Sequence, residues 1–527
     1  MDAVHGGQST GGKQVGHGTP PLCLPASRLS RHTGAVSAVL PLSGEDQPFP
    51  VAAPLRALAQ AIVAAGGRPL AVGGSVRDHL RGLPPKDVDV EVYGLSLAAL
   101  EAALSPFSVH AVGRAFGVLK VDVAVGDARE TFDVALPRRE SKSGQGHKGF
   151  VVESDPFLSP ADAASRRDFT VNAIAVDLSA AGQGAASGAA ASGGAALLLV
   201  DPAGGLADLK AGLLRHVSPA FDEDPLRVLR AAQFAARFSF EVAEETVQRC
   251  RALQGELATL PKERVWTELE KLLLRGVWPS AGLQVLLRTG ALEVLFPEIF
   301  ALVGCAQEEE WHPEGDVWVH TLLVVDEAAR LARLEALDDA ETLRLVLGAL
   351  CHDLGKPATT VFEDGRIRSR DPESQGEEPT RAMLLRVGAP HELIDDVVAL
   401  VREHLKPFHL YRETASDAAV RRLALRVPLP RLVRVARADH LGRTTPDALL
   451  RDDPAGDWLL QKAKELAVAD AAPKPILLGR HLLARGVAAG PAMGALLKAA
   501  FDAQLDGRFG DEAGALAWLD EQLRSQA

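Results

Sequence analysis

The sequence predicts an α+β protein in which a mixed sheet with helices comes first and all-α domains follow. Short stretches between residues 51 and 205 alternate apolar and polar residues, as half-buried strands do. From Leu206 onward, apolar residues recur at helical spacing, interrupted by proline and glycine. The 527 residues correspond to roughly three to four domains at about 150 residues each. We therefore expect one sheet-containing domain and several helical ones.

Composition and charge limit the class of protein. A hydrophobic content of 47% and a charged content of 24% are ordinary for a globular protein. The net charge of −12 argues against a protein that coats nucleic acid non-specifically, although one basic groove remains compatible with it. The four cysteines lie far apart without a CxxC pair, which favours a reducing compartment. Because neither a membrane span nor a signal peptide is evident, we expect a cytoplasmic protein with no membrane partner.

Composition also marks the expected boundaries. The first 50 residues are rich in Gly, Ser, His and Pro without periodicity, so we expect a disordered leader. A low-complexity segment, residues 179–196, lies between two apolar strands and is interpreted as an inserted surface loop. The last region contains two helix-like stretches to which no chemistry is assigned. The expected regions are 1–50, 51–205, 206–305, 306–450 and 451–527.

Each element of the sheet-containing domain has its own signal. A helix is expected over 54–67, a strand over 69–74 and a second helix from Ser75 to Gly82, where Gly-Leu-Pro-Pro ends it. The remaining strands are expected where apolar residues alternate or run together between turn residues. These stretches are "DVDVEVYG", "GVLKVDVAV", "ETFDVALP", "NAIAVDL" and "LLLVDP".

The stretch "GGSVRDHLRGLPPKDVDVEVYG", residues 73–94, combines a glycine turn with paired carboxylates. Asp87 and Asp89 are two apart on an expected strand, so both would face one side, within reach of a divalent ion. The turn at Gly73-Gly74-Ser75 would present backbone N–H groups to a phosphate, and Arg77 could add a charge-assisted contact. The alternative is a plain turn beside a solvated strand. Together these groups favour attack of a hydroxyl on a nucleoside triphosphate.

This stretch resembles the signature of the polymerase-beta-type nucleotidyltransferases that comprise the bacterial CCA-adding tRNA nucleotidyltransferases and the poly(A) polymerases. Three further stretches match in order, and the likeness covers about residues 51–300. The resemblance implies addition of C and A to the 3′ end of tRNA from CTP and ATP, with Mg²⁺ on Asp87 and Asp89. The further stretches are "RRDFTVNAIA", "DPAGGLADL" and "EDPLRVLRAAQFAARF".

The first of these stretches is similar to the family's ribose- and triphosphate-contacting motif. Arg167 could bind the triphosphate, while Asp168 and Asn172, one helical turn apart, could hold the ribose 2′-OH. A helix-start aspartate and a charged surface pair are the alternative. Asp133 in "TFDVALPRRE" is a candidate third carboxylate for the metals, or else an ordinary acid at a strand end.

The stretch beginning at Asp224 resembles the family's nucleotide-selecting helix. Asp224 and Arg227 could act as a protein template, the carboxylate accepting from the exocyclic amine of A or C and the guanidinium donating to the ring nitrogen. Arg230 continues the same face. The alternative is that Asp224, before a proline, only caps the helix. Gln233 stands where many relatives carry another arginine.

Three basic or helical segments are candidates for contact with tRNA. The run 137–149 resembles the flexible loop that the family needs for the final A, although its composition equally supports an exposed linker. The segment 421–443 is strongly basic and predicts either a solvated helical face or part of a tRNA-backbone track. The helical region 206–300 could hold the acceptor stem by shape and phosphate contacts.

The second half carries the order H…HD…D of the HD metal-dependent phosphohydrolases, in His320, His352, Asp353 and Asp439. Imidazole and carboxylate ligands from several helices suit a divalent transition metal or Mg²⁺. The pattern resembles the HD domain appended to some CCA-adding enzymes, which implies phosphatase and 2′,3′-cyclic phosphodiesterase activities. Pro372 stands where that resemblance leads one to expect a histidine, and His404 is a candidate outer ligand.

Two other functions stay open at this point. The protein could be a poly(A) polymerase or an enzyme that adds only A, because the base-selecting motifs overlap. In a different class, it could be an HD phosphohydrolase whose N-terminal half merely binds nucleotide or RNA; the intact Asp87-Val88-Asp89 argues against this. The oligomeric state is not fixed by the sequence.

Overall fold

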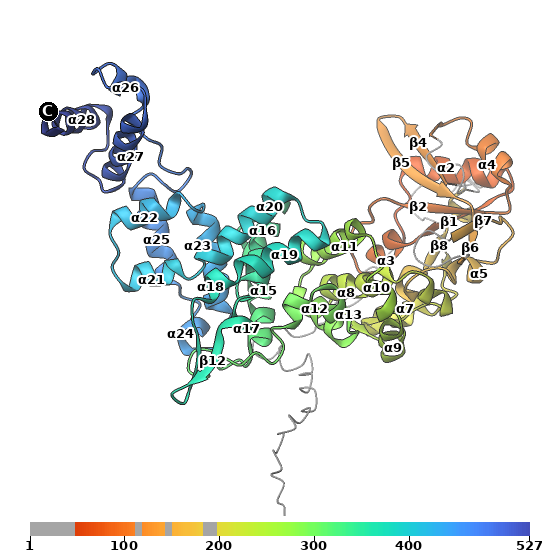
Figure 1. Ribbon diagram of the computed structural model, residues 1–527. Coiled ribbons are helices and arrows are strands. Elements are labelled where there is room, and N and C mark those ends of the chain that lie inside the picture. The colour runs from red at the N-terminus through yellow and green to blue at the C-terminus, as the bar shows by residue number, and fades with distance from the viewer. Residues whose placement is uncertain (1–47, 111–117, 143–149, 183–197, 527) are drawn as a thin grey trace, which may run out of the picture.

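The computed structural model describes residues 48–110, 118–142, 150–182 and 198–526 (Figure 1). The chain forms an elongated molecule with the large sheet at one end, the HD-type helices in the middle and the C-terminal helices at the other end. The expected leader lies outside the described residues apart from its last three, and so does most of the expected insertion.

A seven-stranded sheet forms the N-terminal end, in the order β3-β4-β5-β2-β1-β8-β9. Strands β2 and β5 are parallel and the other neighbours are antiparallel, so the sheet is mixed as predicted. All six stretches expected as strands contribute to it, and β3 was not expected. The strands are β1 (Arg68–Val72), β2 (Asp89–Tyr93), β3 (Ser108–His110), β4 (Val118–Val125), β5 (Ala128–Ala135), β8 (Ala175–Asp177) and β9 (Leu198–Val200).

One face of this sheet is covered by helix α2 (Ala53–Ala64), which buries Leu58 and Ile62 and contacts β1, β4 and β5. Two expected loops lie only partly within the described residues. The first residues of the expected insertion form helix α6 (Ser179–Gly182), packed on α2, and residues 138–142 of the expected loop at 137–149 form strand β6 (Arg138–Lys142), paired with β7 (Phe150–Ser154). The rest of both segments lies outside the described residues. The other elements of this region are α3 (Gly74–Leu80), α4 (Leu97–Ala103), α5 (Pro160–Ala164) and the 3₁₀ helix η2 (Thr170–Asn172).

The following region packs around helix α8 (Leu226–Phe238), which lies against α11 (Lys262–Arg275) and α12 (Pro279–Arg288). Ten of its thirteen residues are buried, because apolar residues occupy most of its circumference. Its neighbours are α7 (Gly205–Ala211), η3 (Pro219–Glu223), α9 (Glu244–Ala252), α10 (Gln254–Leu257), α13 (Ala291–Leu295), α14 (Pro297–Phe300), β10 (Leu213–Leu214) and β11 (Glu241–Val242).

Helices α15 (Val317–Leu334), α16 (Asp339–Cys351), α20 (His391–Glu403) and α23 (Leu429–Gly442) form the centre of the HD-type region. A hairpin of β12 (Thr360–Glu363) and β13 (Arg366–Ser369) interrupts a region that was expected to be helical almost throughout. Shorter helices surround this centre: α17 (Lys356–Thr359), α18 (Pro372–Gln375), α19 (Glu377–Val387), α21 (Lys406–Arg412), α22 (Asp417–Ala424), α24 (Pro446–Leu449) and α25 (Pro454–Glu465).

Most buried hydrophobic residues between Phe49 and Val468 belong to one core, and a small second cluster consists of Leu70, Val72, Tyr93, Ala163 and Ala175. A separate core, from Leu477 to Leu519, holds α26 (Gly479–Leu483), α27 (Pro491–Leu505) and α28 (Glu512–Gln526), so three helices occupy the segment where two were expected. Within the part of the chain that the structure describes, no helix combines the length and apolar character needed to cross a membrane.

Candidate functional site

Three carboxylates, those of Asp87, Asp89 and Asp133, meet where the first residue of β2 pairs with β5. Asp89 and Asp133 are directly paired in the parallel register of these strands. Asp87 does not lie on the strand, which begins at Asp89; its φ of 49° is in the left-handed region, where aspartate is more common than most residues. Burial, and then the charges of Asp133 and Asp87, raise the pKa of Asp89. Carboxylates that raise one another's pKa in this way suit a divalent cation.

The glycine turn lies beside these carboxylates. Gly73 has a φ of 81°, and a Cβ there would lie 3.5 Å from Arg167 Nη1 and 3.7 Å from Asp89 Oδ2. The left-handed backbone favours glycine here, and a Cβ would be in ordinary van der Waals contact with Arg167 and Asp89. Helix α3 starts directly after it, at Gly74, and Ser75 Oγ closes the turn by donating to Val72 O at 3.3 Å. The structure thus brings Arg167, the turn and the acidic edge together.

Arg77 is placed differently from the prediction. Its side chain is buried, donates to Asn172 Oδ1 and to Asp78 Oδ1, and stacks 4.6 Å from the Phe238 ring. Burial lowers the pKa of Arg77. This arginine links α3 to η2, so in this structure it orients Asn172 rather than facing an open phosphate site.

Asp168 is the centre of a buried network. Its Oδ1 accepts from Asn172 Nδ2 at 2.9 Å and from Phe169 N at 2.8 Å, and its Oδ2 accepts from Arg230 Nε at 2.8 Å and Nη2 at 2.6 Å. Burial opposes the charge, but Arg230 and the hydrogen bonds hold the pKa of Asp168 below its ordinary value. Asn172 ends a 3₁₀ turn rather than an α-helical one. Asp168 is therefore held as a charged carboxylate, and its contact with Asn172 is fixed in place.

Both side chains of the expected base template have protein partners. Asp224 Oδ1 accepts from Leu226 N at 3.1 Å, which is the capping contact of the alternative interpretation, and its Oδ2 accepts from Arg264 Nη2 at 2.9 Å. Arg227 donates to Ala220 O at 2.7 Å and to Arg166 O at 2.6 Å. Sequence reasoning missed Arg264, which lies in the first turn of α11, 40 residues later.

Gln233, the position at which the chain departs from many relatives, is on α8 and only 4% exposed. Its side chain is therefore part of the helix's packed surface.

The four predicted HD residues converge in the second half. His320 is on α15, His352 ends α16, Asp353 follows it and Asp439 is on α23, and none is more than 5% exposed. His320 Nε2 lies 3.0 Å from Asp439 Oδ1 and 4.0 Å from Asp353 Oδ2, while His352 Nε2 lies 3.2 Å from Asp353 Oδ2 and 4.0 Å from Asp439 Oδ1. Nitrogen and oxygen atoms at these separations can surround one ion.

The histidine tautomers fit a metal. His352 Nδ1 lies 2.7 Å from Ala349 O, and since a carbonyl only accepts, Nδ1 carries a proton and Nε2 is the nitrogen available to a metal. Among the described residues, this buried Nε2 has no hydrogen-bond partner. His404 repeats the arrangement, with Nδ1 2.6 Å from Val401 O and its ring 5.3 Å from that of His352. An unpartnered buried nitrogen beside two carboxylates indicates a metal site.

Two cations that the sequence analysis did not single out adjoin this cluster. Lys356 Nζ lies 2.8 Å from Asp353 Oδ2, and Arg443 Nη2 lies 3.1 Å from Asp439 Oδ2. Burial opposes ionisation of the two aspartates, but these cations and the histidines hold both pKa values well below the usual range. The motif LGKP and the i, i+4 spacing of Asp439 and Arg443 are the signals that could have found them.

Pro372 supplies no ligand in place of the expected histidine. A Cβ on Gly355 would lie 1.9 Å from Pro372 O, so the backbone at Pro372 packs directly on the turn that follows Asp353.

The basic segment 421–443 is not a free cationic surface. Five of its arginines form ion pairs with carboxylates of other elements, so much of its positive charge is already compensated within the protein. The pairs are Arg422–Asp506, Arg426–Glu403, Arg431–Glu341, Arg434–Glu335 and Arg437–Asp453.

Comparison with known proteins accounts for this combination of regions. Residues 70–215 match the poly A polymerase head domain, 239–302 the probable RNA and SrmB-binding site of polymerase A, and 317–444 the HD domain. The Multifunctional CCA protein of Stenotrophomonas maltophilia is 41% identical over 385 residues, which cover 71% of this chain and 85% of that protein. The chain belongs to the family of CCA-adding tRNA nucleotidyltransferases and poly(A) polymerases that carry a C-terminal HD domain.

Solved structures of CCA-adding enzymes share the fold. The Bacillus stearothermophilus CCA-adding enzyme in complex with CTP has a TM-score of 0.58 at 22% identity, covering 90% of this chain and 98% of that one. The Thermotoga maritima CCA-adding enzyme complexed with tRNA has a TM-score of 0.53 at 20% identity, covering 89% and 94%. The predicted family and fold class are confirmed, and both the nucleotidyltransferase and HD families are metal-dependent.

Proposed function

We propose that the protein adds C and A, CCA or part of it, to the 3′ end of tRNA from CTP and ATP without a nucleic-acid template, and releases pyrophosphate. The observation that carries this proposal is the meeting of Asp87, Asp89 and Asp133 beside Arg167 and the Gly73 turn. The name of the curated relatives and the CTP and tRNA complexes of proteins with this fold support it.

Each group would have a distinct part in the reaction. The three carboxylates would hold Mg²⁺, which supplies a lower pKa for the tRNA 3′-OH and stabilises the leaving pyrophosphate. Arg167 and the backbone N–H groups after Gly73 would hold the triphosphate in line. The Asp168–Asn172 pair would contact the ribose. The 3′-OH then attacks the α-phosphate, and the bond to pyrophosphate breaks.

Base choice would rest on Asp224 and Arg227. Asp224 would accept from the exocyclic amine of A or C, whereas U and G present a carbonyl there. Each carboxylate oxygen has two lone pairs, so the contacts to Leu226 N and Arg264 still leave one acceptor position on each. Arg230, bound to Asp168, would connect the base-reading helix to the ribose contact.

We further propose a phosphatase or 2′,3′-cyclic phosphodiesterase activity at the HD site. The observation that favours it is the unpartnered Nε2 of His352 facing Asp353 and Asp439. His320, His352, Asp353 and Asp439 would hold a divalent transition metal, with His404 as a candidate further ligand. Lys356 and Arg443 would attract the anionic phosphate.

Incorporation assays separate the candidate functions. The protein is incubated with tRNA ending before CCA, or after CC, and with single labelled nucleotides. Incorporation of C and then A into tRNA ending before CCA supports CCA addition. Incorporation of A into tRNA ending after CC, with no incorporation into the first substrate, indicates an A-adding enzyme. Long A tails indicate a poly(A) polymerase. No incorporation together with hydrolysis of a 2′,3′-cyclic phosphate would favour the HD phosphohydrolase alternative.

A further inference from the structure

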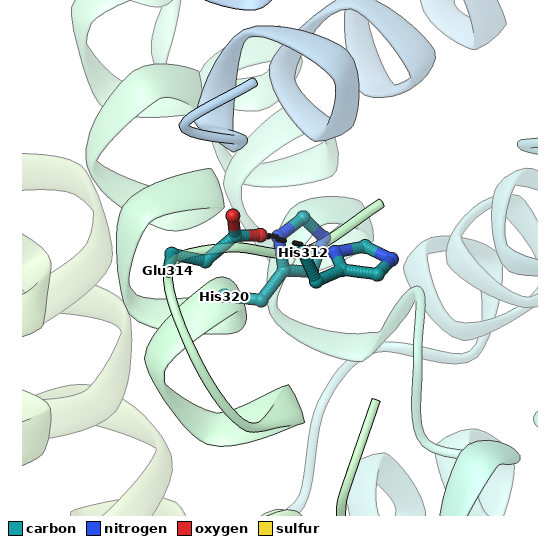
Figure 2. A group of neighbouring side chains, drawn as sticks. All are labelled: His312, Glu314 and His320. Atoms are coloured by element: carbon teal, nitrogen blue, oxygen red, sulfur yellow. Dashed lines mark hydrogen bonds and ion pairs between the residues drawn. The ribbon is translucent and has the colours of Figure 1, made fainter. Parts of the chain in front are cut away.

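Glu314 lies in the loop before α15, and its side chain is 1% exposed. Its Oε1 lies 3.0 Å from His312 Nδ1 and 2.8 Å from His320 Nδ1, as Figure 2 shows. Its Oε2 accepts from Thr444 N at 3.1 Å and from Thr444 Oγ1 at 3.2 Å. Each oxygen of this buried carboxylate therefore accepts two hydrogen bonds.

The residue types His312, Glu314 and His320 could themselves suggest a metal site. The hydrogen bonds argue against it, because a carboxylate that accepts four of them has no lone pair left for a cation. Only His320 also belongs to the group with His352 and Asp353. Glu314 thus contacts a member of that group, His320, without belonging to the group itself.

The contact between Glu314 and His320 fixes the histidine's chemistry. A carboxylate only accepts, so Nδ1 carries a proton and Nε2 is the nitrogen directed at Asp439 Oδ1, 3.0 Å away. So short a contact needs a proton or a cation between the two atoms. A carboxylate behind a histidine ligand also makes the imidazole a stronger donor to a metal.

Glu314 also connects two helices. His320 is on α15, and Thr444 follows the end of α23, which carries Asp439. One side chain therefore holds both the ring of one predicted ligand and the chain beside another. His312, in the loop before α15, also contacts Glu314 Oε1, and its ring centroid lies 4.6 Å from that of His320.

We propose that Glu314 is the positioning residue of the HD metal site: it sets the tautomer and direction of His320 and holds the ends of α15 and α23 in register. This inference rests on the proposed HD metal site. The group behind Glu314 takes no ion of its own, so one cluster, centred on His320, His352, Asp353 and Asp439, accounts for metal bound in this half.

The test is Co²⁺ binding to the full chain by calorimetry, in an Asp87→Ala, Asp89→Ala background that removes the other candidate site. Glu314→Gln should raise the Kd for Co²⁺ by about 10–100-fold, as loss of a carboxylate behind a histidine ligand does. Glu309→Gln, an exposed glutamate of the same loop, is the matched control and should keep the Kd. In the otherwise unaltered chain, Glu314→Gln should keep nucleotide addition.

Glu314→Gln could fail to fold, and loss of a cooperative thermal melt would reveal this. A second variant keeps the inference testable in that case. Thr444→Val removes only the hydroxyl donor and should weaken Co²⁺ binding several-fold. Binding that is lost in His352→Ala with Asp353→Ala but unchanged in the folded Glu314 or Thr444 variant overturns this inference alone. A background protein that binds no Co²⁺ overturns both this inference and the proposed HD metal site.

Discussion

Asp89 and Asp133 are directly paired across the parallel strands β2 and β5. Since burial and the charges of Asp133 and Asp87 raise the pKa of Asp89, the folded protein keeps these like charges together at a cost in stability. Such a cost is expected where a site is arranged for a cation rather than for the free energy of folding.

Asp89→Asn should therefore lower incorporation of both C and A by at least about 100-fold, the loss seen when one charge-stabilising group is removed from a reacting centre. Because a raised carboxyl pKa destabilises the folded chain above that pKa, the variant should melt at a higher temperature than the natural protein at pH 8. Incorporation assays and thermal melts measure the two effects. Wild-type incorporation by Asp89→Asn would contradict the assignment.

Asp224→Ala combined with Arg227→Ala should relax discrimination against UTP and GTP. Hydrogen-bond readout of a base by such a pair contributes about 1–3 kcal/mol, so the preference should fall by roughly 10–100-fold. Competition between labelled nucleotides on tRNA ending before CCA gives the ratio. A folded double variant with unchanged preference would restrict Asp224 to capping α8.

His352→Ala with Asp353→Ala should lose bound transition metal and any hydrolysis of 2′,3′-cyclic phosphate, yet keep nucleotide addition. The two sites lie on different elements of the elongated molecule (Figure 1), so neither supplies a group to the other. Metal content by atomic emission and parallel incorporation assays measure this. Unchanged metal content in the double variant would show that the ion is held elsewhere.

The buried contact between α12 and α15 should make stability depend on pH. Asp326 accepts from Ser280 N at 2.9 Å and from Ser280 Oγ at 2.5 Å, and burial raises its pKa to about 7. Its folded pKa exceeds the unfolded value of about 3.9. The stability that this difference contributes is complete below about pH 4 and is lost as the pH rises through about 7.

As the pH is raised from 5 to 8, the melting temperature of the Asp326→Asn variant should therefore fall less than that of the natural protein. Melting temperatures across that range measure the difference, and other titrating groups cancel because both proteins share them. Parallel curves for the two proteins would show that Asp326 does not titrate in this range.

Local pattern was sufficient for six of the seven strands of the large sheet and for bringing together the H…HD…D residues, because alternation and motif order report burial and chemistry directly. It was insufficient where a partner is distant. The contact of Arg264 with Asp224 and those of Glu314 with His320 and Thr444 join segments that only the fold brings together. The left-handed backbone at Asp87, which moves it off the strand, has no sequence signal stronger than aspartate itself.

The division between the core that ends at Val468 and the core that starts at Leu477 has a consequence for how the molecule can change. The two bodies are joined by polar contacts, such as Arg421 Nη1 to Leu505 O at 3.0 Å and Arg422 Nη2 to Asp506 Oδ1 at 2.7 Å. Because the core that holds both candidate sites includes no residue of the C-terminal unit, we expect this unit to be a module that can be exchanged, tilted or lost while the rest of the chain stays folded.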